Sequence, residues 1–108
     1  MKTIRLKAVK ADKFSEKCVG LIGKDDKTFL YLETRFGIHT FGMRHKIDVL
    51  ILDEKNTVRK IKKGLSPNRF FFWNPVYRKV MEMPSGSVMM KSIQPGDKIN
   101  LSFFINKY

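Results

Sequence analysis

The segment around residue 44 gathers side chains that could bind or transform a small molecule. Thr40, Met43, Arg44 and Asp48 bring a hydroxyl, a thioether, a guanidinium and a carboxylate into one loop and the strand after it. Arg44 could bind a carboxylate or phosphate through two parallel hydrogen bonds, and Asp48 could accept a donor or act as a base when buried. The segment therefore predicts a small polar pocket for an anionic ligand.

The same residues also fit a purely structural role. Arg44 and Asp48 could pair with each other, or Asp48 could accept hydrogen bonds from turn amides and so fix the loop. His39 and His45 do not turn the segment into a metal site, because their spacing matches no zinc signature and His45 lies in a basic loop. No metal and no cofactor is therefore predicted.

A second candidate surface comes from a basic and aromatic stretch in the middle of the chain. Between Glu54 and Glu82 there are eight Lys or Arg residues and no acidic residue. The stretch also contains five aromatic residues, a composition typical of platforms that bind single-stranded nucleic acid, in which cations contact phosphates and exposed rings stack on bases. The residues predicted to form this surface are Arg59, Lys60, Lys62, Lys63, Arg69, Trp73, Tyr77, Arg78 and Lys79.

Two simpler interpretations compete with this one. The rings of residues 70–73 could belong mainly to the core, although consecutive aromatic residues on one strand cannot all point inward, so one or two are expected at the surface. The net charge of +12 attracts polyanions in general, and it could equally reflect a lysine-rich surface that serves solubility.

The sequence shows no recognisable catalytic constellation, so it leaves open whether the protein is an enzyme. No Ser or Cys lies in a nucleophile motif, and no glycine pattern resembles a phosphate-binding loop. The neighbouring acids Asp25-Asp26 and Asp53-Glu54 lie in predicted exposed turns. The primary hypothesis is a binding module for an anionic partner, and the alternative is a small-ligand or enzymatic site around Arg44 and Asp48.

The composition is that of one small domain spanning residues 1–108. Hydrophobic residues make up 43% of the chain and nine residues are Phe, which is enough for a stable core. Charges interrupt the apolar residues at the N-terminus, so no signal peptide or membrane span is expected, and we expect a cytoplasmic protein. Cys18 is the single cysteine, which excludes an internal disulfide and fits a buried thiol in a reducing compartment.

These residues must be positioned by short strands. Alternation of apolar and polar residues or β-rich composition predicts strands at 3–9, 28–32, 37–41, 47–52, 57–61, 77–83 and 99–105, the last with Phe103 facing inward. Residues 69–73 are expected to form a dense aromatic strand or a loop. Helical spacing predicts a helix over 12–21, and residues 87–93 predict a weaker one. The fold class is therefore mainly β, an antiparallel β-barrel or jelly-roll-like sandwich with one or two short helices.

Several ordered motifs resemble a prokaryotic family, domain of unknown function 192. The segment from Gly37 to Asp53 resembles the family pattern His-Thr-x-Gly-Met-Arg-Phe-Pro-Ile-Asp-Val-x-Phe-Leu-Asp, with His45-Lys46 in place of Phe-Pro. The runs at 20–22, 81–86 and 96–97 resemble its Gly-Leu-Met, Leu-Glu-Leu-Pro-Ala-Gly and Gly-Asp, with Ile22 for Met and Ser85 for Ala. The resemblance implies a compact domain like a β-barrel or jelly roll, and no activity comes with it.

Overall fold

A computed structural model describes residues 1–11, 29–35 and 37–104 of the chain. The helix predicted over 12–21, with Cys18, lies outside these residues, as does the end of the last predicted strand. Within the described ranges, none of the helical segments has the length and apolar character needed to span a membrane.

Six strands form one curled sheet with the order β5-β4-β7-β2-β1-β8. Its strands are β1 (Thr3–Lys10), β2 (Leu30–Glu33), β4 (Ile47–Leu52), β5 (Val58–Leu65), β7 (Lys79–Pro84) and β8 (Lys98–Phe103). Two further strands, β3 (Gly37–His39) and β6 (Phe70–Phe72), pair with each other in a separate two-stranded sheet. The prediction of a mainly β domain is confirmed.

The pairing is antiparallel except at β1, which runs parallel to both β2 and β8. The sheet curls far enough for its two edge strands to meet at one end, where Thr57 bridges Lys98. Three backbone hydrogen bonds join the edges there. Those from Val58 N to Asp97 O and from Gly96 N to Val58 O are 2.8 Å long, and the one from Ile99 N to Asn56 O is 2.9 Å long. The curled sheet is therefore a half-barrel that is fastened at one end.

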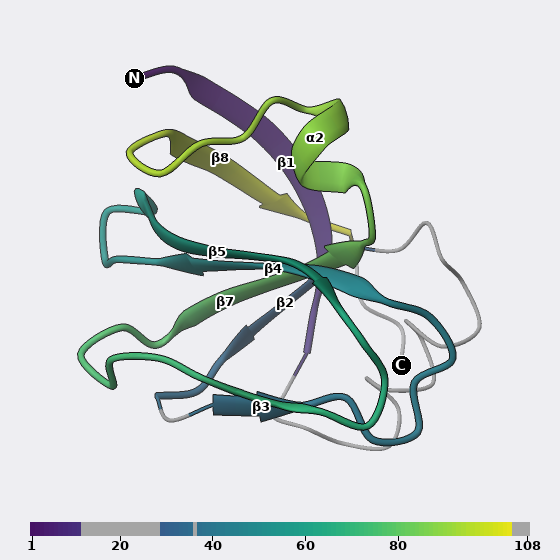
Figure 1. Cartoon of the computed structure of the whole chain (residues 1–108). Helices are drawn as coiled ribbons and strands as arrows, with labels where there is room; N and C mark the ends of the chain where they lie inside the picture. Colours follow the sequence, from purple (N-terminus) through teal and green to yellow (C-terminus); the bar gives the residue numbers. More distant parts are fainter. Residues whose placement is uncertain (12–28, 36, 105–108) are drawn as a thin grey trace.

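The sheet has an apolar cluster on each face. Figure 1 shows a short helix on one side of the sheet and β3 on the other. A short helix, α2 (Ser87–Met90), covers one face and contributes Val88 to its cluster. The ribbon of β3 and β6 covers the other face, and Ile38 belongs to that cluster. Because both faces are covered, every residue of β4 is buried, which confirms that this nearly all-apolar run is an interior strand.

Two predicted details differ in the structure. The strand after the Asp53–Asn56 loop continues to Leu65 rather than ending at Ile61, because it stays paired with β4 as far as Ile47. Phe103 lies on the predicted face of β8 with Ile99 and Leu101, but it is 40% exposed because it is at the end of this edge strand. Its ring contacts Tyr31 at a centroid distance of 5.4 Å.

Candidate functional site

The outer face of the β3–β6 ribbon carries a row of aromatic rings, which we call the aromatic ladder. It consists of the exposed Phe41, Phe70 and Phe72 and the partly buried His39. The rings of Phe70 and Phe72 lie nearly parallel, 10° apart, with centroids 5.8 Å from each other. Phe41 meets Phe70 edge to face at 4.9 Å and stacks with His39 at 5.1 Å. The four rings therefore form one continuous aromatic surface.

Strand alternation explains why this surface is exposed. Phe70 and Phe72 point outward and are 60% and 63% exposed, whereas Phe71 between them packs against the apolar cluster beneath the ribbon. The prediction that one or two of the consecutive rings reach the surface is confirmed. Gly37 lies opposite Phe72, and a Cβ at Gly37 would be 2.5 Å from the Phe72 ring, so glycine is what lets this ring lie flat on β3.

Cations border the aromatic ladder on the side of β5. Lys60 and Lys62 are in register with Ile51 and Val49, so they leave β5 on the face that the ribbon covers. The Lys60 ammonium lies 5.3 Å from the centre of the Phe71 ring. Arg69 is exposed directly before β6, and Lys63 is exposed on β5. Lys60 and Lys62 of the predicted surface therefore leave the sheet on the ribbon side, and Lys60 lies beside Phe71.

Other residues of the predicted surface lie elsewhere or are already engaged. Trp73 is only 7% exposed and its indole N–H donates to the Tyr77 carbonyl, so its ring is not available for stacking. The Arg59 guanidinium lies 5.7 Å from the Tyr77 ring. Both of these contacts remove a predicted stacking ring from the free surface.

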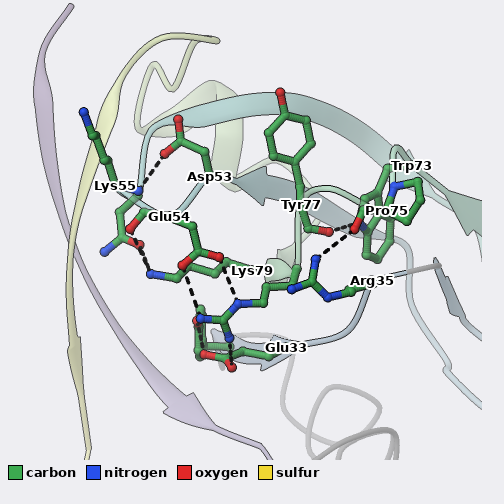
Figure 2. Close-up of polar contacts among 12 residues, drawn as sticks. Glu33, Arg35, Asp53, Glu54, Lys55, Trp73, Pro75, Tyr77 and Lys79 are labelled. Atoms are coloured by element: carbon green, nitrogen blue, oxygen red, sulfur yellow. Dashed lines mark hydrogen bonds and ion pairs between the residues drawn. The ribbon is translucent and has the colours of Figure 1, made fainter.

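Arg78 and Lys79 lie at the start of β7 and form a cluster of charged side chains with two acidic residues. Arg78 forms ion pairs with Glu33 and Glu54, and Lys79 donates to the Glu54 carbonyl and the Asn56 amide oxygen. Figure 2 shows the side chains of Glu33, Glu54 and Lys79 converging in this cluster. Hydrogen bonds from Arg78 to both carboxylates raise the pKa of its guanidinium further. The cluster balances charge internally and is a poor phosphate site.

The residues of the predicted polar pocket do not converge in the structure. Met43 belongs to the apolar cluster beneath the ribbon, and Arg44 is exposed. Asp48 alternates with Ile47 and Val49, so its side chain lies on the opposite face of the sheet. There its two carboxylate oxygens accept three backbone amides, from Gly64, Gly86 and Val88, at 2.9 to 3.1 Å. Asp48 thus has the turn-amide role that the sequence left as an alternative.

Thr40 is fully buried and fixes the loop that leads into β6. Its hydroxyl donates to the Ser66 carbonyl at 2.6 Å and accepts from the Arg69 amide at 2.9 Å. We expect Thr40→Val to lower the free energy of unfolding by about 1 to 3 kcal/mol, because the Ser66 carbonyl and the Arg69 amide lose the buried hydroxyl as their partner. Urea unfolding tests this, with Thr3→Val at an exposed position of β1 as the control. Equal stability of the two variants would contradict the role of the hydroxyl.

Glu82 is the functional candidate that the sequence did not single out. It is fully buried in β7, and burial raises the pKa of its carboxyl group to about 8. The one signal in the sequence was a carboxylate between Met81 and Met83 in a motif shared with the family that the chain resembles. In the part of the chain that is described, no group of three or more His, Cys, Asp or Glu side chains could hold a metal ion.

Comparison with known proteins places the chain in a family. Residues 1–101 match the sequence model of DUF192, described as an uncharacterized ACR. The chain belongs to the DUF192 family. A DUF192 relative, UPF0127 protein PF1050 of Pyrococcus furiosus, is 30% identical over 104 residues, which cover 91% of this chain and 89% of the relative.

Two solved structures share the DUF192 fold seen here. A protein of unknown function from Novosphingobium aromaticivorans superposes with a TM-score of 0.67 at 17% identity, covering 82% of this chain and 70% of that one. A protein from Sinorhizobium meliloti, described as a candidate transcription regulator, gives a TM-score of 0.62 at 17% identity, covering 81% and 74%. These likenesses establish the fold and leave the function to the geometry of the site.

Proposed function

We propose that the protein binds single-stranded nucleic acid along the aromatic ladder. The observation that carries the proposal is the pair of parallel rings of Phe70 and Phe72, which are 60% and 63% exposed. Exposed apolar rings of this size are costly unless a partner covers them. Flat rings accept any base by stacking, which suits a partner recognised without regard to sequence.

The charges around the ladder favour a polyanionic partner over an apolar protein surface. Lys60, Lys62, Lys63 and Arg69 are exposed along β5 and before β6, and the whole chain carries a net charge of +12. Such cations would contact phosphates while the rings stack on the bases. A single strand fits this arrangement better than a duplex, because the bases of a duplex are already stacked on each other.

Replacing both parallel rings tests the proposal. We expect the double variant Phe70→Ala, Phe72→Ala to bind oligo-dT or oligo-U about thirtyfold more weakly or worse, since each stacked ring contributes about 1 kcal/mol or more. The measurement is fluorescence anisotropy. The matched control is Phe103→Ala, Phe104→Ala, which removes two rings that are 40% and 51% exposed on another part of the surface.

The salt dependence of the affinity in the same titration gives the number of phosphate contacts. Four cations should give a slope of log affinity against log salt of about −3, because each contact to a single strand contributes about −0.7. Affinity of the wild type no greater than that of an unrelated protein of similar charge would overturn the proposal. So would equal affinity of the ladder variant and the wild type.

A further inference from the structure

The interior layer beneath the ribbon contains a buried carboxyl group, that of Glu82. Glu82 lies on β7 in the middle of the sheet and is in register with Leu30 of β2 and Val49 of β4. Both neighbours belong to the apolar cluster beneath the ribbon. Its neighbours on the same face of its own strand are Val80 and Pro84. The carboxyl group therefore points into the apolar layer between sheet and ribbon.

Neither carboxyl oxygen of Glu82 has a hydrogen-bond partner in the part of the chain that the structure describes. The other two buried carboxylates among these residues behave differently. Asp48 accepts three backbone amides, and Asp97 accepts the Lys2 amine, the Lys2 amide and the Gln94 amide. Buried polar groups in folded proteins are paired, so the Glu82 carboxyl group calls for a partner that the described residues do not supply.

The surroundings of Glu82 decide what kind of partner fits. A carboxyl group that keeps its proton presents an O–H donor beside a carbonyl acceptor. An amine cation would bring a charge into a layer lined mainly by apolar side chains, so its desolvation would be expensive. A neutral group with an N–H beside a carbonyl satisfies both carboxyl oxygens at once and brings no charge.

We propose that Glu82 anchors an interior binding site for a small, mainly apolar molecule with a cis-amide edge, as in a lactam. The carboxyl O–H donates to the ligand carbonyl, and the ligand N–H donates to the carboxyl C=O, without transfer of a proton. The rest of the ligand contacts the aliphatic side chains of Leu30 and Val49. The ribbon above them is a separate two-stranded sheet, so ligand entry leaves the hydrogen bonds of the main sheet intact.

The probe for this site is 2-piperidone, and the matched control is N-methyl-2-piperidone, which lacks the N–H donor. Binding is followed by NMR of the protein labelled with carbon-13 at the glutamate side-chain carboxyl groups. We expect saturable shifts of the Glu82 signal with 2-piperidone and about five- to tenfold weaker binding of the N-methyl compound, the factor that one hydrogen bond contributes.

Two variants distinguish a role of Glu82 in binding the ligand from a role in the stability of the fold. Glu82→Gln keeps a donor beside an acceptor, so it should bind 2-piperidone within about threefold of the wild type, as judged from amide shifts. Glu82→Met removes both groups and should weaken binding by about tenfold or more. Wild-type binding should also weaken above pH 8, where the carboxyl loses its proton, whereas binding to Glu82→Gln should not change with pH.

The proposal fails if no probe shifts the Glu82 signal up to about 100 mM, well above the millimolar affinity expected for so small a fragment. It also fails if Glu82→Met binds 2-piperidone as tightly as the wild type. The Glu82→Gln variant keeps the test decisive if Glu82→Met does not fold. The ladder variants and Glu82 variants change different residues and are tested with different ligands, so failure of this proposal is distinguishable from failure of nucleic-acid binding.

Discussion

Substituting Glu82 by glutamine should remove a loss of stability that the wild type suffers between about pH 4.5 and pH 8. In the unfolded chain this carboxyl group ionises near its ordinary pKa of 4.5, whereas burial raises its pKa in the folded protein to about 8. Between these values unfolding releases a proton, so raising the pH favours the unfolded state. Each pH unit costs about 1.4 kcal/mol, which gives about 4 to 5 kcal/mol over the interval.

The measurement is urea unfolding of the wild type and of Glu82→Gln at a series of pH values from 5 to 9. The difference between the two curves isolates Glu82, because every other titrating group is common to both proteins. Glu82→Met should show the same pH dependence as Glu82→Gln. It should be more stable than Glu82→Gln at every pH, since methionine leaves no polar group unpaired. Parallel curves for the wild type and Glu82→Gln would show that Glu82 titrates normally.

The reason that the sequence did not single out Glu82 lies in tertiary structure. Alternation along β7 places Met81 and Met83 on one face and Val80 and Glu82 on the other, the ordinary pattern of a strand with one face in solvent. The ribbon of β3 and β6 covers that second face and buries it. No local sequence pattern predicts that a two-stranded ribbon, distant in sequence, will pack on the face that carries Glu82.

The strands themselves were predictable because their signals are local. The nearly all-apolar run of β4 and the turn at Asp53–Asn56 place a hairpin correctly, and Pro84-Ser85-Gly86 marks the start of α2. The parallel pairing of β1 with both neighbours was not predictable, because register between distant strands depends on the closed shape of the sheet.

Long-range ion pairs explain why the basic surface was predicted only in part. Arg78 pairs with Glu33 and Glu54, which lie 45 and 24 residues away in the chain. The positive charge of the basic stretch between Glu54 and Glu82 is therefore neutralised at one end, although the stretch itself contains no acidic residue. Trp73 turns inward because alternation continues past β6, placing it on the side of Phe71. The exposed rings of Phe70 and Phe72 follow from the same alternation.

Substitution of Asp48 is the second change from which we expect a large loss of stability, and substitution of Asp53 is its matched control. Asp48 uses both carboxylate oxygens: Oδ1 accepts from Gly64, and Oδ2 accepts from Gly86 and Val88. Gly64 and Gly86 have positive φ values of 63° and 95°, a backbone conformation that suits glycine, so these amides converge on one carboxylate. The interaction ties β4 to the end of β5 and to the start of α2.

Substituting Asp48 by asparagine should therefore lower the free energy of unfolding by about 2 to 4 kcal/mol. The asparagine NH₂ group must face an amide N–H, which loses at least one charge-assisted hydrogen bond and leaves a donor unpaired. Asp53 accepts both the Lys55 and the Thr57 amides through Oδ1 alone, so Asp53→Asn keeps its carbonyl in place and should change stability by less than about 0.5 kcal/mol. Urea unfolding of the two variants shows whether the loss of stability comes from the charge of the carboxylate or from the number of its accepting oxygens. Equal losses would mean that the charge of the carboxylate matters and the number of its accepting oxygens does not.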